Sequence, residues 1–340
     1  MRMDKVTLYF NSTLAHFSQL ITGLELLKEE RKIELKYKLG LYSYPVHIFK
    51  IEYNGHSVFF DMSDNSDLDK NVLEESDFYV KRMLLIKDFN THKKLIPFGL
   101  NYQVYFKNPF LQFLFFRNRK LLKYSLRYSK TASRALNIKD CVITNNLKNT
   151  VSLPSLDNNI VFSARLWNPI NNNEQWKQQE RHIINSQRME IVENMRIAYG
   201  IHFKGGIQKD SFSLQQCPDL LLSNHEYHKK NYLKILKNSG IGIVNPGLEQ
   251  SISWKMGEYV AHSLAIVTTP IKKYKLLGDF QEEKNYMVFN NLDECLEKTE
   301  TLFSNDKLRK AMQRANHEYY LNYLHPAKKL ELILRQIKNA

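Results

Sequence analysis

Residues 240–270 read GIGIVNPGLEQSISWKMGEYVAHSLAIVTTP and carry the strongest fold signal in the chain. The apolar run 241–244 predicts a buried strand, and Pro246-Gly247 predicts a turn after it. The pattern then predicts a helix over 253–262 and a second strand over 264–268. Strand, helix and strand in this order form a βαβ unit, so we expect a parallel sheet and an α/β fold.

Small polar residues stand just before the predicted helix. Ser253 is a favoured N-cap residue, and backbone N–H groups at a helix start attract phosphate. Lys255 adds a positive charge in the first turn, and Glu258 can accept hydrogen bonds from two neighbouring ribose hydroxyls. Ligands of parallel sheets bind at the carboxyl ends of the strands, so these residues predict a nucleoside diphosphate site. The alternative is that Lys255 and Glu258 are charges on a solvated helix face.

Strand and helix patterns alternate along the rest of the chain, which supports the α/β class. Strands are expected over 6–10, 46–52, 57–60 and 160–164, with Asn54-Gly55 as a hairpin turn signal. Helices are expected over 14–30, 172–198, 292–302 and 306–321, and Pro326 breaks the helical pattern near the end.

The segment 141–160 is rich in Asn, Ser and Pro and marks a junction between two domains. A chain of 340 residues is too long for one ordinary hydrophobic core. We therefore expect domains over 1–155 and 156–325, followed by a C-terminal helix over 326–340.

The composition is that of a globular, basic protein. Hydrophobic residues make up 43% and charged residues 25%, and the formal net charge of +14 favours an anionic partner. Cys141, Cys217 and Cys295 lie too far apart for a metal motif or a disulfide framework. The chain shows no signal-peptide pattern and no apolar run approaching about 18 residues, so we expect a cytoplasmic protein.

The segment 102–130 contains seven basic residues and no acidic residue, with aromatic residues between them. Three interpretations are open: nucleic-acid binding, peripheral contact with an anionic membrane, and an amphipathic helix packed on the core. Apolar residues cluster at 110–116 and basic residues at 117–130, an arrangement that suits a surface dipping into lipid.

The runs 253–261 and 264–270 resemble the donor domain of GT-B glycosyltransferases of the family 1/family 4 type, which include bacterial enzymes of surface-polysaccharide synthesis. The run 162–169 resembles the strand that opens this domain, and Arg165 stands where the family usually contacts the donor pyrophosphate. The tail pattern Asn285-Tyr286…Asp293-Glu294-Cys295 is similar too. The resemblance covers about 160–325, and 59–64 and 77–82 are more weakly similar.

The resemblance implies two Rossmann-like domains facing across a cleft (GT-B architecture), the first binding the acceptor and the second a nucleotide sugar. It also implies that the C-terminal helix crosses back to the first domain. The implied activity is a hexosyltransferase reaction that moves a sugar to a glycan or lipid-linked acceptor. No metal or other cofactor is expected, because fixed positive charge can stabilise the leaving diphosphate. The expected donor site comprises Arg165, Gly247, Gln250, Ser251, Ser253, Lys255 and Glu258.

One departure from the family concerns its pair of Glu residues eight positions apart. Glu258 occupies the second position, which looks like the ribose ligand, whereas Gln250 occupies the first. The stereochemical outcome therefore stays open. An inverting enzyme needs a base for the acceptor hydroxyl, and the candidates are His16, Asp61 and Asp64.

Several alternatives accompany this interpretation. His16 can instead be structural, and Asp61 and Asp64 can instead belong to turn chemistry. Lys81 and Arg82 either contact acceptor phosphate or are surface charges. Because many relatives use lipid-linked acceptors, we expect peripheral contact of 102–130 with the inner face of the membrane and no nucleic-acid partner. The rival functions are a non-catalytic scaffold of this fold and a basic nucleic-acid-binding protein.

Overall fold

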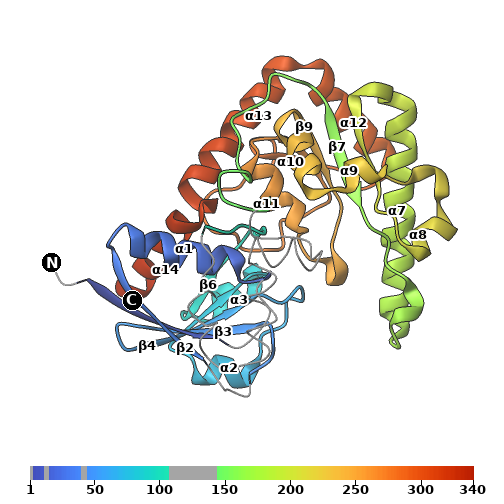
Figure 1. Cartoon of the computed structure of the whole chain (residues 1–340). Helices are drawn as coiled ribbons and strands as arrows, with labels where there is room; N and C mark the ends of the chain where they lie inside the picture. Colours follow the sequence, from blue (N-terminus) through green and yellow to red (C-terminus); the bar gives the residue numbers. More distant parts are fainter. Residues whose placement is uncertain (1–2, 11–14, 40–43, 107–143) are drawn as a thin grey trace, which may run out of the picture.

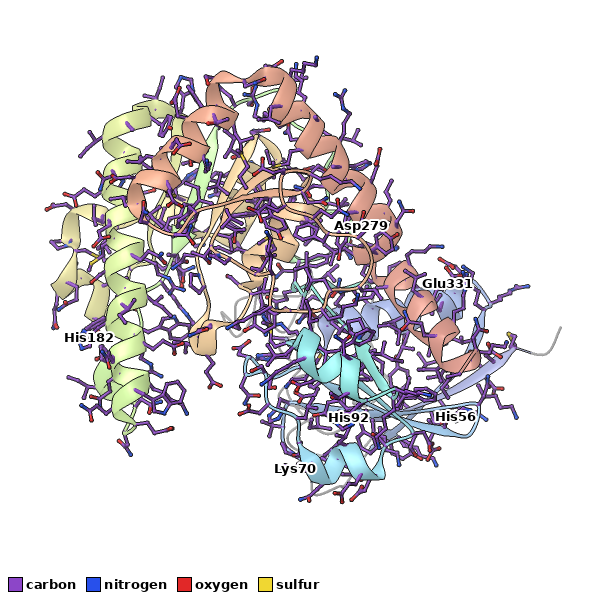
Figure 2. All side chains as sticks on the ribbon, turned by 180° about the vertical axis from the view of Figure 1, so that it is seen from behind. His56, Lys70, His92, His182, Asp279 and Glu331 are labelled. Atoms are coloured by element: carbon purple, nitrogen blue, oxygen red, sulfur yellow. The ribbon has the colours of Figure 1, made fainter. Side chains whose placement is uncertain are left out.

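Two β-sheets organise the chain in a computed structural model, which describes residues 3–10, 15–39, 44–106 and 144–340. Figure 1 shows the first sheet with the N-terminal segments in blue and the second with the segments from green to orange. Each sheet organises one half of the molecule, which we call the first half and the second half. Figure 2, a view from behind, labels Lys70, His56 and His92 in the first half and His182 on the long helix of the second half. The α/β prediction is confirmed.

The first sheet has six strands in the order β2-β1-β3-β4-β5-β6. Its elements are β1 (Asp4–Phe10), α1 (Ser18–Glu29), β2 (Ile33–Leu39), β3 (Ile48–Tyr53), β4 (His56–Asp61), α2 (Lys70–Glu75), β5 (Phe78–Lys81), α3 (Ile86–Thr91) and β6 (Leu95–Pro97). Strand β3 runs antiparallel to both of its neighbours, whereas the other pairs are parallel.

Mixed pairing in the first sheet and parallel pairing in the second agree with the expected architecture of two α/β domains. Asn54 and Gly55 form the predicted hairpin turn between β3 and β4, with φ angles of 50° and 97°. Positive φ at both central residues gives a turn whose twist matches the strands. This hairpin places one antiparallel strand in the middle of an otherwise parallel sheet.

The second sheet has five strands in the order β11-β10-β9-β7-β8, and every pair is parallel. Its elements are β7 (Ile160–Ala164), α7 (Gln175–Tyr199), β8 (Phe203–Ile207), α8 (Ser211–Gln216), α9 (Asn224–Tyr227), α10 (Lys229–Lys237), β9 (Ile241–Val244), α11 (Trp254–Ala261), β10 (Ala265–Thr268), β11 (Tyr286–Val288), α12 (Leu292–Ser304), α13 (Asp306–Tyr319), a π-helical turn (Tyr320–Leu324) and α14 (Pro326–Lys338). The βαβ unit predicted from 240–270 is confirmed as β9, α11 and β10.

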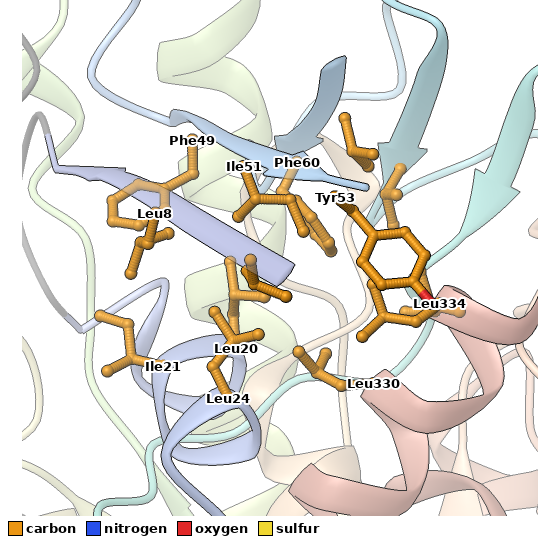
Figure 3. Packing of buried hydrophobic residues seen from close by; sticks show 14 of the residues in the cluster. Leu8, Leu20, Ile21, Leu24, Phe49, Ile51, Tyr53, Phe60, Leu330 and Leu334 are labelled. Carbon is orange, nitrogen blue, oxygen red and sulfur yellow. The ribbon is translucent and has the colours of Figure 1, made fainter. Parts of the chain in front are cut away.

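The last helix, α14, packs against α1 of the first half. Leu330 and Leu334 lie with Leu8 and Leu24 in one buried cluster, as Figure 3 shows. A Cβ atom on Gly23 would stand 2.5 Å from the Pro326 carbonyl oxygen, so the two helices meet at a residue without a side chain. The helix that follows the second sheet therefore completes the core of the first.

Two sequence predictions lie wholly or partly outside the described residues. The membrane-contact segment 102–130 is described only over 102–106, where Tyr102 and Val104 are buried. The domain boundaries at 155 and 325 stay predictions. In the described ranges no helix has the length and apolar character needed to cross a bilayer.

We predict that His262, at the end of α11, makes the fold sensitive to acid. Burial lowers its pKa from 6.5 to about 3. The unfolded chain therefore binds a proton between these values while the folded chain does not, so stability falls as the pH falls through 6.5. From pH 7 to pH 5 the loss should be about 2 kcal/mol.

Urea unfolding of the wild type and of His262→Gln at both pH values tests this. The variant should lose about 2 kcal/mol less stability between the two pH values than the wild type. His202, an exposed histidine at the far end of α7, supplies the control His202→Gln, which should behave as the wild type. Equal acid sensitivity of the wild type and His262→Gln would contradict the prediction.

Candidate functional site

The start of α11 lies at the carboxyl edge of the second sheet, directly after β9. Ser253 caps the helix, and its Oγ accepts a hydrogen bond of 3.4 Å from the Lys255 N–H. The N-cap prediction for Ser253 is confirmed. The helix thus presents its positive end toward the edge where ligands of such sheets bind.

A pocket of about 240 Å³ opens beside this helix start. Lys255, Glu258 and Ser253 line it from α11 and its cap, while Ser163 lines it from the end of β7. From β7 the chain continues to β8 on one side of the sheet, and from β9 it continues to β10 on the other side. The pocket therefore lies between β7 and β9, where the strand order reverses. We call it the nucleoside pocket, after the ligand that the sequence predicts at this helix start.

Glu258 is held by two side chains of α10 that the sequence interpretation missed. Lys229 forms an ion pair with Glu258 Oε1, and the Tyr232 hydroxyl donates to Oε2 at 2.9 Å. Burial by itself would raise the pKa of Glu258, but the charge and hydrogen bond of Lys229 outweigh it and lower the pKa. Glu258 is therefore an ionised acceptor on the pocket wall, not a charge on a solvated helix face.

Lys255 is a partly buried cation that forms no ion pair with any described residue. Burial is the main cause that lowers its pKa to about 8. The neighbouring charge of Glu258 acts in the opposite direction, and the charges of Arg188, Lys229 and Arg165 reinforce the lowering. Lys255 therefore lies within reach of one carboxylate and three further cations.

Arg165 lies at the same edge, where the sequence placed it after β7. Its guanidinium stacks at 3.5 Å over the ring of Trp167, and the residue is exposed. Although the residue as a whole is exposed, partial desolvation of its guanidinium lowers the Arg165 pKa, whereas the carboxylates of Asp210 and Asp64 raise it. The structure thus brings Arg165 and Lys255 within electrostatic reach of each other.

Arg188 on α7 is a third residue that the sequence interpretation missed. It is buried, and its guanidinium donates to the Arg165 carbonyl at 2.6 Å and to the Pro246 carbonyl at 3.1 Å. These bonds tie the loop after β7 to the loop after β9. Burial, followed by the charge of Arg165, lowers the pKa of Arg188 to about 9.

The loop 246–251 is closed by short-range bonds. Gly247 N–H donates to the Ser251 carbonyl at 2.9 Å, and a Cβ atom on Gly247 would stand 2.4 Å from Ser251 Oγ. Glu249 and Gln250 both have positive φ, at 58° and 55°, which strains non-glycine residues. The Gln250 side chain accepts a bond of 2.5 Å from Lys273 Nζ, so it is held at the loop surface.

His16 comes to this edge from the first half of the molecule. Its ring meets the ring of Trp254, the first residue of α11, edge-on at 4.8 Å. Asn101 donates to the His16 carbonyl at 3.1 Å, and a Cβ atom on Gly257 would stand 2.6 Å from the Asn101 carbonyl. The glycine in the middle of α11 therefore allows the close approach that positions His16.

Burial lowers the pKa of His16 despite the nearby carboxylate of Asp64, so the imidazole is neutral at neutral pH. A neutral imidazole can accept a proton. This state is the one that a general base requires.

Arg82 joins the two halves beside His16. It is buried, forms an ion pair with the partly exposed Asp64 and donates at 2.6 Å to the carbonyl of Ile252. The expectation that Lys81 and Arg82 contact acceptor phosphate or the solvent is wrong, since both are buried. Lys81 is the last residue of β5 and Arg82 follows it directly, and both side chains point into the interior.

Asp61 is buried inside the first half, where it occupies a structural position. It is 1% exposed, and Lys81 Nζ and the Tyr79 hydroxyl both donate to its Oδ2, at 2.8 Å and 2.7 Å. Burial would raise its pKa, but Lys81 and Ser63 outweigh burial and lower it. A carboxylate that is buried and saturated with donors is unsuited to take a proton from an acceptor.

The arrangement can bind a ligand with a diphosphate and a hydroxyl-rich sugar ring. Lys229 and Lys255 line the pocket together with two carboxyl residues, Glu226 and Glu258. Arg165 and Arg188 lie outside the lining but close enough to act on the charge of Lys255. Among the residues that the structure describes, no three His, Cys, Asp or Glu side chains are grouped to hold a metal ion.

No protein-family model matches the chain, and no curated protein matches it. Similar solved structures include a glycosyltransferase from Rickettsia africae, with 12% identity, a TM-score of 0.41, and coverage of 97% of this chain and 85% of that chain. A putative UDP-N-acetylglucosamine 2-epimerase from Listeria monocytogenes has 12% identity and a TM-score of 0.42, covering 100% and 98%. The pneumococcal O-GlcNAc transferase GtfA, in complex with UDP and GlcNAc, has 11% identity and a TM-score of 0.38, covering 94% and 55%.

We predict that Arg82→Met lowers the free energy of unfolding by about 2–3 kcal/mol. The change keeps apolar volume but removes a charge-assisted bond to Asp64 and the donor to the buried Ile252 carbonyl. Urea denaturation measures the effect. Arg335→Met, at an exposed position on α14, is the matched control and should stay within about 0.5 kcal/mol of the wild type. Equal losses in the two variants would contradict the bridging role.

Proposed function

We propose that this protein is a glycosyltransferase that uses a nucleotide-sugar donor. The observation that carries the proposal is the electrostatic environment of the nucleoside pocket. Lys255 lies unpaired beside three further cations at a helix start, with Glu258 ionised one turn away. A diphosphate relieves the repulsion among the cations, and an ionised carboxylate binds the two hydroxyls of a ribose.

In this proposal each residue has a distinct role. The N–H groups at the start of α11 bind the diphosphate together with Lys255 and Arg165, while Arg188 holds the flanking loops in place. Glu258 binds the ribose and displaces Lys229 or Tyr232 from one of its oxygens. When the glycosidic bond breaks, the fixed positive charge stabilises the leaving nucleoside diphosphate.

We propose His16 as the base that takes the proton of the acceptor hydroxyl, if the reaction inverts the anomeric centre. His16 is neutral and lies against Trp254 at the start of α11. Asp64 is the second candidate, although Arg82 already pairs with it. Asp61 is not proposed as a base, because its carboxylate already accepts hydrogen bonds from the Tyr79 hydroxyl and Lys81 Nζ inside the fold.

We propose that the first half, over 1–155, binds a glycan or lipid-linked acceptor of surface-polysaccharide synthesis, and that 156–325 binds the donor. Support comes from the His16–Trp254 contact, which brings a residue of the first half to the donor helix. Peripheral contact of 102–130 with the inner face of an anionic membrane remains part of the proposal.

Binding of a nucleoside diphosphate should weaken as the pH rises through about 8, the pKa of Lys255. Above this pH the free protein carries a neutral Lys255, so binding must first take up a proton. Calorimetric titration from pH 6.5 to 9.5 measures the profile, with the tightest ligand among UDP, GDP, CDP and ADP. Lys255→Arg keeps the charge and should flatten it. A wild-type profile that is flat across this range would contradict the role of Lys255.

Transfer should fall about 100-fold in Glu258→Gln and in Arg165→Ala, since each removes a contact to the bound donor. A panel of UDP-, GDP- and CMP-sugars, assayed for transfer and hydrolysis, gives the rates. Glu297→Gln and Arg335→Ala change exposed residues of the same types and should keep the wild-type rate. Melting curves check that each variant is folded. Normal turnover in both site variants would remove the assignment, and nucleotide binding without any turnover would favour the scaffold function.

A further inference from the structure

A cavity of about 530 Å³ lies between the two halves of the molecule, beyond the loop 246–250. The first half lines it with Asp67 and the two residues before it, and the second half with the first turns of α7 and the loop after β9. We call it the outer cavity. It is formed by both halves, so it exists only in the folded, assembled chain.

The outer cavity and the nucleoside pocket each share lining residues with a third cavity. Pro246, Gln250 and Lys273 line both the outer cavity and a cavity of about 470 Å³ at the ends of β9 and β10. Ser253 in turn lines both that cavity and the nucleoside pocket. The three spaces therefore follow one another along 246–253, with the nucleoside pocket at one end and the outer cavity at the other.

Large apolar side chains form one wall of the outer cavity. Trp176 is 52% exposed and Ile183 is 63% exposed, both on the first turns of α7. The indole of Trp176 is oriented by a hydrogen bond of 2.9 Å to Glu174 and by Lys177 at 5.0 Å from the ring. An oriented, half-exposed aromatic ring is a platform for the apolar C–H face of a sugar, because its body is apolar and its edge is polar.

Acidic side chains form the polar part of the lining. Asp67, Glu180 and Glu249 line the cavity, and Glu180 accepts a bond of 3.1 Å from the Gln250 N–H. Burial raises the pKa of Glu249, and the neighbouring carboxylates raise it further against the charge of Lys177. The one lysine of the lining, Lys273, already donates to Gln250.

Such a lining accepts hydroxyl hydrogen bonds and repels phosphate. Carboxylates offer acceptors for sugar hydroxyls, while an anionic ligand would meet three carboxylates against one lysine in a partly enclosed space. Repulsion of anionic ligands contributes to specificity as much as contacts to a neutral ligand do.

We propose that the outer cavity is the acceptor subsite and that it takes a neutral, hydroxyl-rich glycan instead of a phosphate-bearing chain. The proposal rests on the proposed function, since it assumes that a donor occupies the nucleoside pocket. Trp176 supplies the platform for a sugar ring, and Asp67 and Glu249 bind its hydroxyls. The acceptor then reaches the donor along the loop 246–253, past Gln250.

Ligand binding to the full chain tests the proposal without any transfer assay. Maltopentaose and chitopentaose serve as neutral probes and an oligomer of glycerol phosphate as the anionic probe, with saturation-transfer NMR and calorimetry as readouts. We expect a neutral probe to bind and the anionic probe to fail. Trp176→Ala should weaken neutral-probe binding at least about 10-fold, whereas Ile197→Ala, at an exposed position on the same helix outside the cavity, should leave it unchanged.

A second variant tests the charge of the lining. Asp67→Lys should admit the glycerol phosphate oligomer that the wild type rejects. Tighter binding of the anionic than of the neutral probes to the wild type would overturn the proposal. So would failure of both neutral probes, or their full binding to Trp176→Ala, in a protein that still binds a nucleoside diphosphate. Loss of nucleoside diphosphate binding in the wild type would instead overturn the proposed function and this inference with it.

Discussion

Unbalanced positive charge at the start of α11 is the constraint on which the candidate site depends. Lys255, Lys229, Arg165 and Arg188 come from four separate segments, and two carboxyl residues, Glu226 and Glu258, line the same pocket. Holding like charges together in a partly buried space costs free energy, so the fold must keep them there by other contacts. The bonds from Arg188 to two loop carbonyls and the packing of Trp167 on Arg165 are such contacts. An anionic ligand recovers this cost when it binds.

The two halves meet at the same place, so the site depends on the interface between them. Ile86 N–H donates to the Lys273 carbonyl at 3.1 Å, and Lys275 N–H donates to the Leu84 carbonyl. Together with Arg82 and the close approach at Gly257, these bonds fix the first half against the loop and helix that carry the candidate site residues. The positions of His16 and of the outer cavity follow from this attachment.

The sequence predicted those features that depend on neighbouring residues. The buried runs 241–244 and 264–268, the Asn54-Gly55 turn and the Ser253 cap all follow from local patterns, and all are present. Lys229, Tyr232 and Arg188 could not be found in this way, because the sheet order alone brings α10 and α7 to α11. The burial of Arg82 likewise depends on a partner 170 residues away. Strand β2 was overlooked although Ile33, Leu35 and Tyr37 alternate with charged residues.

A crystal structure with the nucleoside diphosphate that binds most tightly tests the central claim most directly. The account predicts that the diphosphate lies within about 3 Å of the N–H groups at the start of α11 and of Lys255 Nζ, with the ribose on Glu258. Arg165 should turn toward the phosphates. A nucleotide bound elsewhere, with the Glu258–Lys229 pair intact and the nucleoside pocket unfilled, would contradict it.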